Sequence, residues 1–237
     1  MDLMATTTGP IQIPTMWFRT TSNRSAFTLV ELLAVVAILG IMLAVALPYF
    51  SGISEGAAME GSIRELRSTL SLARQWAITK RVKTYVVFPD NSINSVSTDR
   101  DKAYNSFNVY TKEDQYIGEW RYLKPGICFV YSQNVDPKSP AVTSNAKNIF
   151  DTKYRASVKF PAGGSSRSLP CIIFYPDGKP RLADGSELGM DAEIYLGEGK
   201  LILEGGSPKV VFPDTSPVIG VDVNALTGRI RTRDYNE

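Results

Sequence analysis

The hydrophobic pattern predicts one long helix in the first third of the chain. No charged residue occurs at 32–50, and this run is close to the roughly 20 apolar residues that a helix needs to cross a bilayer. We expect a helix from about Phe27 to Thr79, apolar all round in its first half and docked on a globular domain in its second half. The docking face is predicted by apolar residues that recur at spacings of three and four: Met59, Ile63, Leu66, Leu70, Ala73 and Ala77.

Pro48 lies inside this predicted helix. A proline removes one backbone hydrogen bond, so we expect a kink at this position. Gly52, Gly56 and Gly61 weaken the helix just beyond the proline, which is consistent with a locally unwound stretch.

After the helix, the pattern changes to short runs of β-branched and aromatic residues, which predict strands. Residues 218–233 predict two more strands around a turn at Asn224–Gly228. Two polar stretches, 90–106 and 133–156, are predicted to be surface loops. The sequence therefore predicts an α+β fold in which a long N-terminal helix packs on an antiparallel β-sheet. The other predicted strands fall within 83–90, 107–112, 116–123, 126–132, 157–160 and 171–178.

Composition narrows the classes of function. The chain has 237 residues, 43% hydrophobic, which is enough for one domain with a core, and its net charge of +2 demands no polyanionic partner. Histidine is absent, which excludes Ser-His-Asp triads, Cys-His dyads and histidine metal sites. Carboxylate or lysine chemistry stays open, but no motif supports it, and Gly163-Gly164 is too short to cradle a nucleotide. We expect no enzyme and no cofactor.

Cys128 and Cys171 are far apart in the sequence and form no C-x-x-C motif. Two alternatives remain: a pair of buried free thiols, or a disulfide if the domain lies outside the cytoplasm. Asp99 and Asp101 offer too few ligands for calcium, and Arg100 and Lys102 beside them oppose a cation. We therefore expect no metal site.

The flanks of the apolar run predict its orientation in a membrane. Arg19 and Arg24 precede the run with no acidic residue between them, so most of the chain should lie across the membrane from the cytoplasm. A secretory signal is the first alternative, but the run ends in Pro48-Tyr49-Phe50 without an A-x-A site. A plain membrane anchor is the second, and it leaves Glu31 unexplained.

The segment SAFTLVELLAVVAILGIMLAVALPYF (25–50) resembles the N-terminus of type IV pilins and type II secretion pseudopilins, in which a small residue precedes F-T-L-x-E and a long apolar helix. The resemblance implies cleavage by prepilin peptidase between Ala26 and Phe27, and N-methylation of Phe27. It also implies that Glu31 pairs with the N-terminal amine of a neighbouring subunit during assembly, and that Pro48 is the helix-kinking proline. Ala26 departs from the family, which usually has glycine before the cut.

The resemblance implies a division of the chain into four parts. Residues 1–26 would be the cleaved leader, with Met16 as an alternative start of translation. Residues 27–50 would be the transmembrane and filament-core helix, 51–80 the amphipathic helix, and 81–237 the β-rich domain. The protein would cross the inner membrane once, with its globular part in the periplasm, and enter a filament after processing.

Three further motifs resemble the GspH/FimT branch of minor pilins and pseudopilins. They are F-x-P-D-G (174–178), T-G-R (227–229) and the Ala- and Arg-rich helix that leads into a strand (66–88). The branch implies a minor pseudopilin of a type II secretion system, near the tip of a filament that supports protein export across the outer membrane. Its implied partners are other pseudopilins or minor pilins and prepilin peptidase.

The same branch offers an alternative, a FimT-like minor type IV pilin that binds DNA for uptake through a C-terminal G-R-x-R pattern. This pattern occurs at Gly228–Arg231. Alternation on a strand would place Arg229, Arg231 and Arg233 on one face, where they could follow phosphates. The competing interpretation is a solvated strand face near Asp222, and the domain as a whole is not basic.

Overall fold

The computed structural model describes residues 28–94, 97–111, 115–131, 148–213 and 217–234, with the backbone alone at 44–55, 97 and 234. The chain divides into two compact units, Met1–Leu47 and Pro48–Glu237. The second unit is called the head below. An N-terminal helix followed by antiparallel sheets makes the fold α+β, as the sequence predicts.

Helix α1 (Leu29–Lys80) matches the predicted helix closely. All six residues of the predicted stripe are buried, which confirms that this face docks on the head. The unwound stretch near Gly52, Gly56 and Gly61 is not found, because α1 is helical at every residue across Pro48 and these glycines. Burial of Met59 and Ile63 stabilises the helix there, and tertiary packing commonly outweighs the roughly 1 kcal/mol that each glycine costs.

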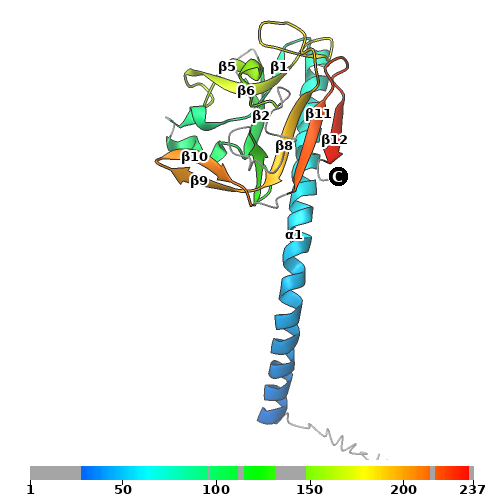
Figure 1. Ribbon diagram of the computed structural model, residues 1–237, viewed down its shortest axis with the longest axis vertical. Coiled ribbons are helices and arrows are strands. Elements are labelled where there is room, and N and C mark those ends of the chain that lie inside the picture. Colours follow the sequence, from blue (N-terminus) through cyan, green and yellow to red (C-terminus); the bar gives the residue numbers. More distant parts are fainter. Residues whose placement is uncertain (1–27, 95–96, 112–114, 132–147, 214–216, 235–237) are drawn as a thin grey trace, which may run out of the picture. The chain divides into compact units, whose positions relative to one another are not determined.

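In the described part of the chain, the strands form two sheets and a separate hairpin (Figure 1). The β1 sheet has the order β3-β2-β1-β6-β5, with β7 on β6, and the β8 sheet has the order β12-β11-β8-β4. The pairs within both sheets are antiparallel. The strands of the β1 sheet are β1 (Thr84–Val87), β2 (Ser106–Thr111), β3 (Gln115–Tyr122), β5 (Arg155–Lys159), β6 (Ser166–Phe174) and β7 (Pro180–Arg181). Those of the β8 sheet are β4 (Ile127–Val130), β8 (Ala192–Glu198), β11 (Val218–Val223) and β12 (Ile230–Asp234).

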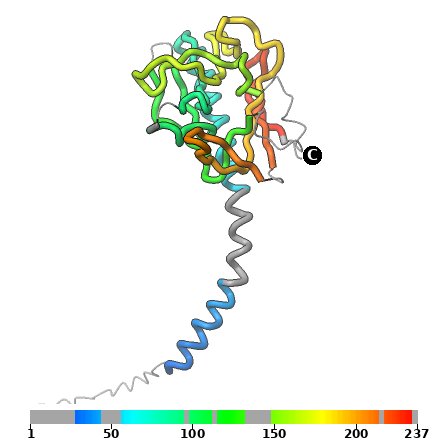
Figure 2. The backbone as a smooth tube through the Cα atoms, turned by 60° about the vertical axis from the view of Figure 1, so that its left-hand side comes forward, coloured from blue at the N-terminus to red at the C-terminus, as the bar shows by residue number. Residues whose placement is uncertain are grey.

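The main core joins α1 to both sheets. The buried stripe of α1 packs with Val86 and Ile172 from the β1 sheet and with Ile194 and Val221 from the β8 sheet. The neighbouring residues on β1 and β6, Val87 and Ile173, point into a second core on the other face of the β1 sheet. The middle of that sheet, at β1, β2 and the second half of β6, is therefore buried on both faces, whereas the edge strand β3 is not. The hairpin of β9 (Lys200–Glu204) and β10 (Ser207–Val211), orange in Figure 2, contributes Val210 to the second core.

The predicted strands and the C-terminal hairpin are all present, but four strands were not predicted: β7, β8, β9 and β10. The most important of these is β8, which lies between β4 and β11. Its sequence, AEIYLGE, carries a glutamate in a strand whose first six residues are all buried. Glu193 tolerates this burial because it accepts a hydrogen bond from the hydroxyl of Tyr195, a partner that the sequence pattern did not indicate.

The prediction that 90–106 and 133–156 are surface loops is only partly right where the structure describes them, because exposed residues such as Asn91 and Asp101 alternate with buried ones. Ile93 and Tyr104 are buried in the first stretch, and Asn148 and Ile149 in the second; residues 133–147 lie outside the described residues. In the first stretch, Asp90 accepts hydrogen bonds from Ser92 N and from both terminal nitrogens of Arg155, at 2.6–3.0 Å. A buried charge needs such a set of partners, and here it fastens the loop to β5.

Cys128 and Cys171 are free, buried thiols with separate hydrogen-bond acceptors, Gly199 O and Tyr154 O. Burial raises the pKa of Cys128 to about 11 and that of Cys171 to about 12. Both thiols therefore stay protonated and weakly nucleophilic at neutral pH. Asp99 pairs with Lys102, and the described residues contain no cluster of three or more potential metal ligands.

Candidate functional site

Thr28 caps the N-terminus of α1. Its hydroxyl accepts a hydrogen bond of 3.2 Å from Glu31 N, and its carbonyl accepts from the amides of Glu31 and Leu32. Glu31 is therefore the third residue of the helix, where a carboxylate interacts favourably with the positive end of the helix dipole. The sequence carries a signal for this cap, Thr-x-x-Glu, a known capping pattern that hydrophobic periodicity does not reveal.

The residues after Glu31 present an apolar surface on all sides of the helix. Every large apolar side chain from Leu29 to Leu43 is 45–79% exposed. An apolar surface that runs all round a helix requires an apolar environment all round, which lipid or a bundle of other helices provides. Glu31 therefore lies in the first turn of a helical segment whose surface is apolar on all sides.

Two of the expected site residues, Ala26 and Phe27, lie outside the described residues, and at Pro48 only the backbone is described. The pairing of Glu31 with an N-terminal amine thus stays a prediction. Among the described residues, no helix is long and apolar enough to cross a membrane.

The three head motifs, far apart in the sequence, meet at the last turns of α1. Arg74 Nε donates a 3.1 Å hydrogen bond to Gly178 O in the P-D-G turn. Gly178 has φ +76°, and a Cβ there would lie 2.7 Å from Cδ1 of Ile78. Gly228 of the T-G-R turn has φ +66°, and a Cβ there would lie 2.2 Å from Gly178 O. Both glycines are therefore needed for close packing, and these motifs build the junction between α1 and the two turns.

The C-terminal arginines do not form the uniform row that the sequence predicts. Strand β12 begins at Ile230, so Arg229 precedes the strand, and only Arg231 and Arg233 alternate within it. The β11 residue opposite Arg231 is Asp222, and Asp222 Oδ2 also lies 3.1 Å from a guanidinium nitrogen of Arg233. The carboxylate reduces the positive charge of this face, while Arg229 and Arg231 remain exposed and have no ion pair with a described residue.

Comparison with known families identifies the N-terminal segment. Residues 21–47 match the family described as prokaryotic N-terminal methylation motif. The chain carries a type IV pilin-like signal. No curated protein and no solved structure matches the chain.

The methylation motif spans Ala26, Phe27 and Glu31. It indicates a type IV pilin-like or pseudopilin protein, and it suggests a membrane anchor, processing by prepilin peptidase and assembly with other pilins. Proteins with this motif are structural rather than enzymatic. The motif covers the start of α1 and none of the head, so it does not distinguish one branch of these proteins from another.

Proposed function

We propose that the protein is a minor pseudopilin of a type II secretion system, a structural subunit near the tip of a filament that supports protein export across the outer membrane. The pilin-like part of this proposal rests on the methylation motif, which lies on a helix that begins with the Thr28 cap and Glu31 and is apolar all round at residues 29–43. The head motifs that meet at Arg74, Gly178 and Gly228 support the branch.

The proposed role gives the first part of α1 two successive environments. Residues 27–50 would lie in the inner membrane, with the head in the periplasm, and would then pass into the core of a filament. A carboxylate near the centre of a bilayer costs on the order of 2.5–3.5 kcal/mol. Glu31 avoids much of this cost by its place in the first helical turn. In the filament it would pair with the amine of Phe27 on a neighbouring subunit, and this would set the register of the subunits.

Processing gives the direct test. In cells with an active prepilin peptidase, we expect mass spectrometry of the membrane-extracted protein to find a mature N-terminus at N-methylated Phe27. Ala26→Leu should block cleavage because the residue before the cut must be small, and Ala26→Gly should be cleaved at least as fast as the original chain. A leader that stays attached in the unchanged protein would contradict the proposal.

A second candidate function is DNA binding by a FimT-like minor type IV pilin, favoured by the exposure of Arg229 and Arg231. For this function, Arg229→Ala with Arg231→Ala should weaken binding of the detergent-solubilised chain to duplex DNA. The slope of log affinity against log salt should fall by roughly 2, because each phosphate contact contributes about 0.9.

The matched control for this experiment removes two other exposed or partly exposed cations, with Lys153→Ala and Lys200→Ala, at the same change in net charge. If the control weakens binding as much as the arginine variant, the attraction is general and the C-terminal strand is not the site. If neither the original chain nor the control binds DNA, the second function is rejected.

A further inference from the structure

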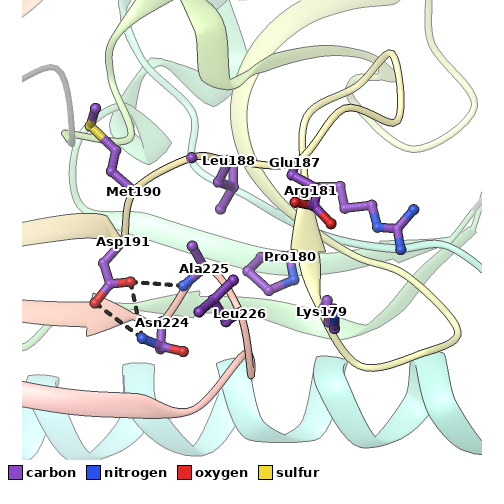
Figure 3. Close-up of a pocket in the computed structure, with 11 residues that line it drawn as sticks. Lys179, Pro180, Arg181, Glu187, Leu188, Met190, Asp191, Asn224, Ala225 and Leu226 are labelled. Carbon is purple, nitrogen blue, oxygen red and sulfur yellow. Dashed lines mark hydrogen bonds between the residues drawn. The ribbon is translucent and has the colours of Figure 1, made fainter.

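A pocket of about 510 Å³ lies beside the last turns of α1, against the end of β2 and the start of β3. This volume falls within the roughly 300–1,000 Å³ that is usual for ligand sites. The pocket at the 224–228 turn is smaller, at about 200 Å³, and Figure 3 shows its Asp191 already engaged by Asn224 and Ala225. We call the larger one the α1-end pocket. Its lining includes Trp76, Lys80, Val82, Thr111, Gln115 and Ile117.

Apolar side chains form much of the wall of the α1-end pocket. Trp76, Val82 and Ile117 are each partly buried, so water still reaches part of their surface. The indole Nε1 of Trp76 makes no hydrogen bond with a residue of the described chain. A bound apolar group would remove this surface from water, and the indole would keep a donor for a polar neighbour of that group.

The charge of the α1-end pocket has one sign. Lys80 is the one charged residue among the described lining residues, and its Nζ lies 5.5 Å from the centroid of the Trp76 ring. This cation–π contact holds the ammonium beside the apolar wall. Lys80 and the exposed Arg81 have no ion pair with a described residue. The three residues between β2 and β3, 112–114, carry one net negative charge, so cations prevail around the pocket.

The backbone of Arg81 is unusual. Its φ is +55°, in the left-handed region that a Cβ disfavours and that glycine adopts freely. Glycine is also the common residue just past the end of a helix, and α1 ends at Lys80. Stability alone therefore favours glycine at this position, whereas a role for the guanidinium in binding requires the arginine.

The α1-end pocket also borders an edge of the β1 sheet. Strand β3 forms that edge, and no other strand of the described chain pairs with its outer side. Gln115, the exposed first residue of β3, and Ile117 both line the pocket. An edge strand presents backbone N–H and C=O groups with which an extended peptide can pair. The pocket thus combines an apolar wall, a cation and a backbone that can hold a peptide.

We propose that the α1-end pocket binds an extended peptide segment of a partner protein that carries an apolar side chain beside a carboxylate. The apolar side chain would pack on Trp76 and Ile117, and the carboxylate would face Lys80 and Arg81. The peptide backbone would pair with the start of β3. A nucleic acid fits this site less well, because it is bound by a groove with a row of cations rather than by apolar walls around one ammonium. The site lies in the head and does not depend on the secretion role.

Fluorescence anisotropy with the full chain in detergent tests the site. The probes are two fluorescein-labelled peptides, V-E-F-E-V and V-K-F-K-V. We expect the acidic peptide to bind saturably with a Kd below about 1 mM, and the basic peptide to bind at least roughly tenfold more weakly. Lys80→Glu should reverse this preference, which a loss of folding cannot do. Lys200→Glu is the matched control, because it makes the same change of charge at an exposed residue of β9; it should leave both affinities within about twofold.

Two further variants test the wall and the rim of the pocket. Trp76→Ala should weaken the acidic peptide by roughly tenfold. Arg81→Gly should weaken it by roughly threefold without lowering the melting temperature, because glycine accepts φ +55°. Normal binding by either variant would overturn the proposal.

The proposal also fails if the acidic peptide does not bind, if Lys80→Glu leaves the preference unchanged, or if Lys200→Glu weakens binding as strongly as Lys80→Glu. Competition by a single-stranded DNA oligonucleotide at the same molar concentration as the acidic peptide overturns it too, because the surface would then attract polyanions in general. None of these results bears on cleavage before Phe27, so the secretion role is tested separately.

Discussion

Gly228→Ala is expected to lower the melting temperature of the head by roughly 6–12 °C. The new Cβ would lie 2.2 Å from the carbonyl oxygen of Gly178 and 3.0 Å from Nε of Arg74, so the backbone of one turn must move. Such overpacking costs typically 1–3 kcal/mol, and the residue also has φ +66°, which disfavours a side chain. A total of about 3 kcal/mol gives the stated shift for a domain of this size.

The measurement is thermal unfolding of the full chain in detergent, followed by near-UV circular dichroism. Gly163→Ala is the matched control, because Gly163 has φ +74° but no atom within 4 Å of the position of a Cβ. It should lose only about 1 kcal/mol, or roughly 2–4 °C, from the backbone conformation. Equal losses in the two variants would mean that the contact between the two turns contributes nothing beyond that conformational cost.

Glu31→Gln is expected to reduce the amount of protein in filaments by roughly 100-fold or more, while cleavage before Phe27 continues. Glutamine keeps the size of the side chain but removes the charge. In the proposed filament, leaving the amine of Phe27 on a neighbouring subunit unpaired would cost about 3–5 kcal/mol, and each 1.4 kcal/mol is a factor of ten. Immunoblots of sheared filament and membrane fractions, from cells with an active secretion system, give the comparison.

Thr28→Ala separates the charge of Glu31 from its place in the helix cap. This change removes the hydroxyl that accepts from Glu31 N but keeps the carboxylate. Loss of such a cap costs about 1 kcal/mol, so filament incorporation should fall by less than roughly tenfold. If Thr28→Ala reduces incorporation as strongly as Glu31→Gln, the role of Glu31 is to start the helix and not to pair with a neighbour.

Most elements of the head were predictable because their residues follow a local rule. The spacing of three and four that ends in Ala73 and Ala77 identified the buried face of α1, and the β-branched run before Phe88 identified β1. Strand β8 was not predicted from the sequence, because Glu193 and Gly197 interrupt both the alternating and the continuous apolar patterns that indicate a strand. The partial burial of the loop at 90–106 was not predicted, because its polar residues do not indicate that Asp90 is buried in an ion pair with Arg155.

The N-terminal segment shows how much a short stretch of sequence can decide. The cleavage pattern, the carboxylate at Glu31 and the apolar run are all properties of neighbouring residues, so they could be predicted directly from the sequence. The match of residues 21–47 to the methylation motif supports a type IV pilin-like signal in this segment. The head differs. Arg74, Gly178 and Gly228 meet only because the two sheets pack against α1, and the 224–228 turn is held in place because Asp191 reaches Ala225 from another part of the chain. Periodicity records what lies within a few residues, whereas these contacts depend on strand pairings between distant segments, and only the tertiary structure decides those.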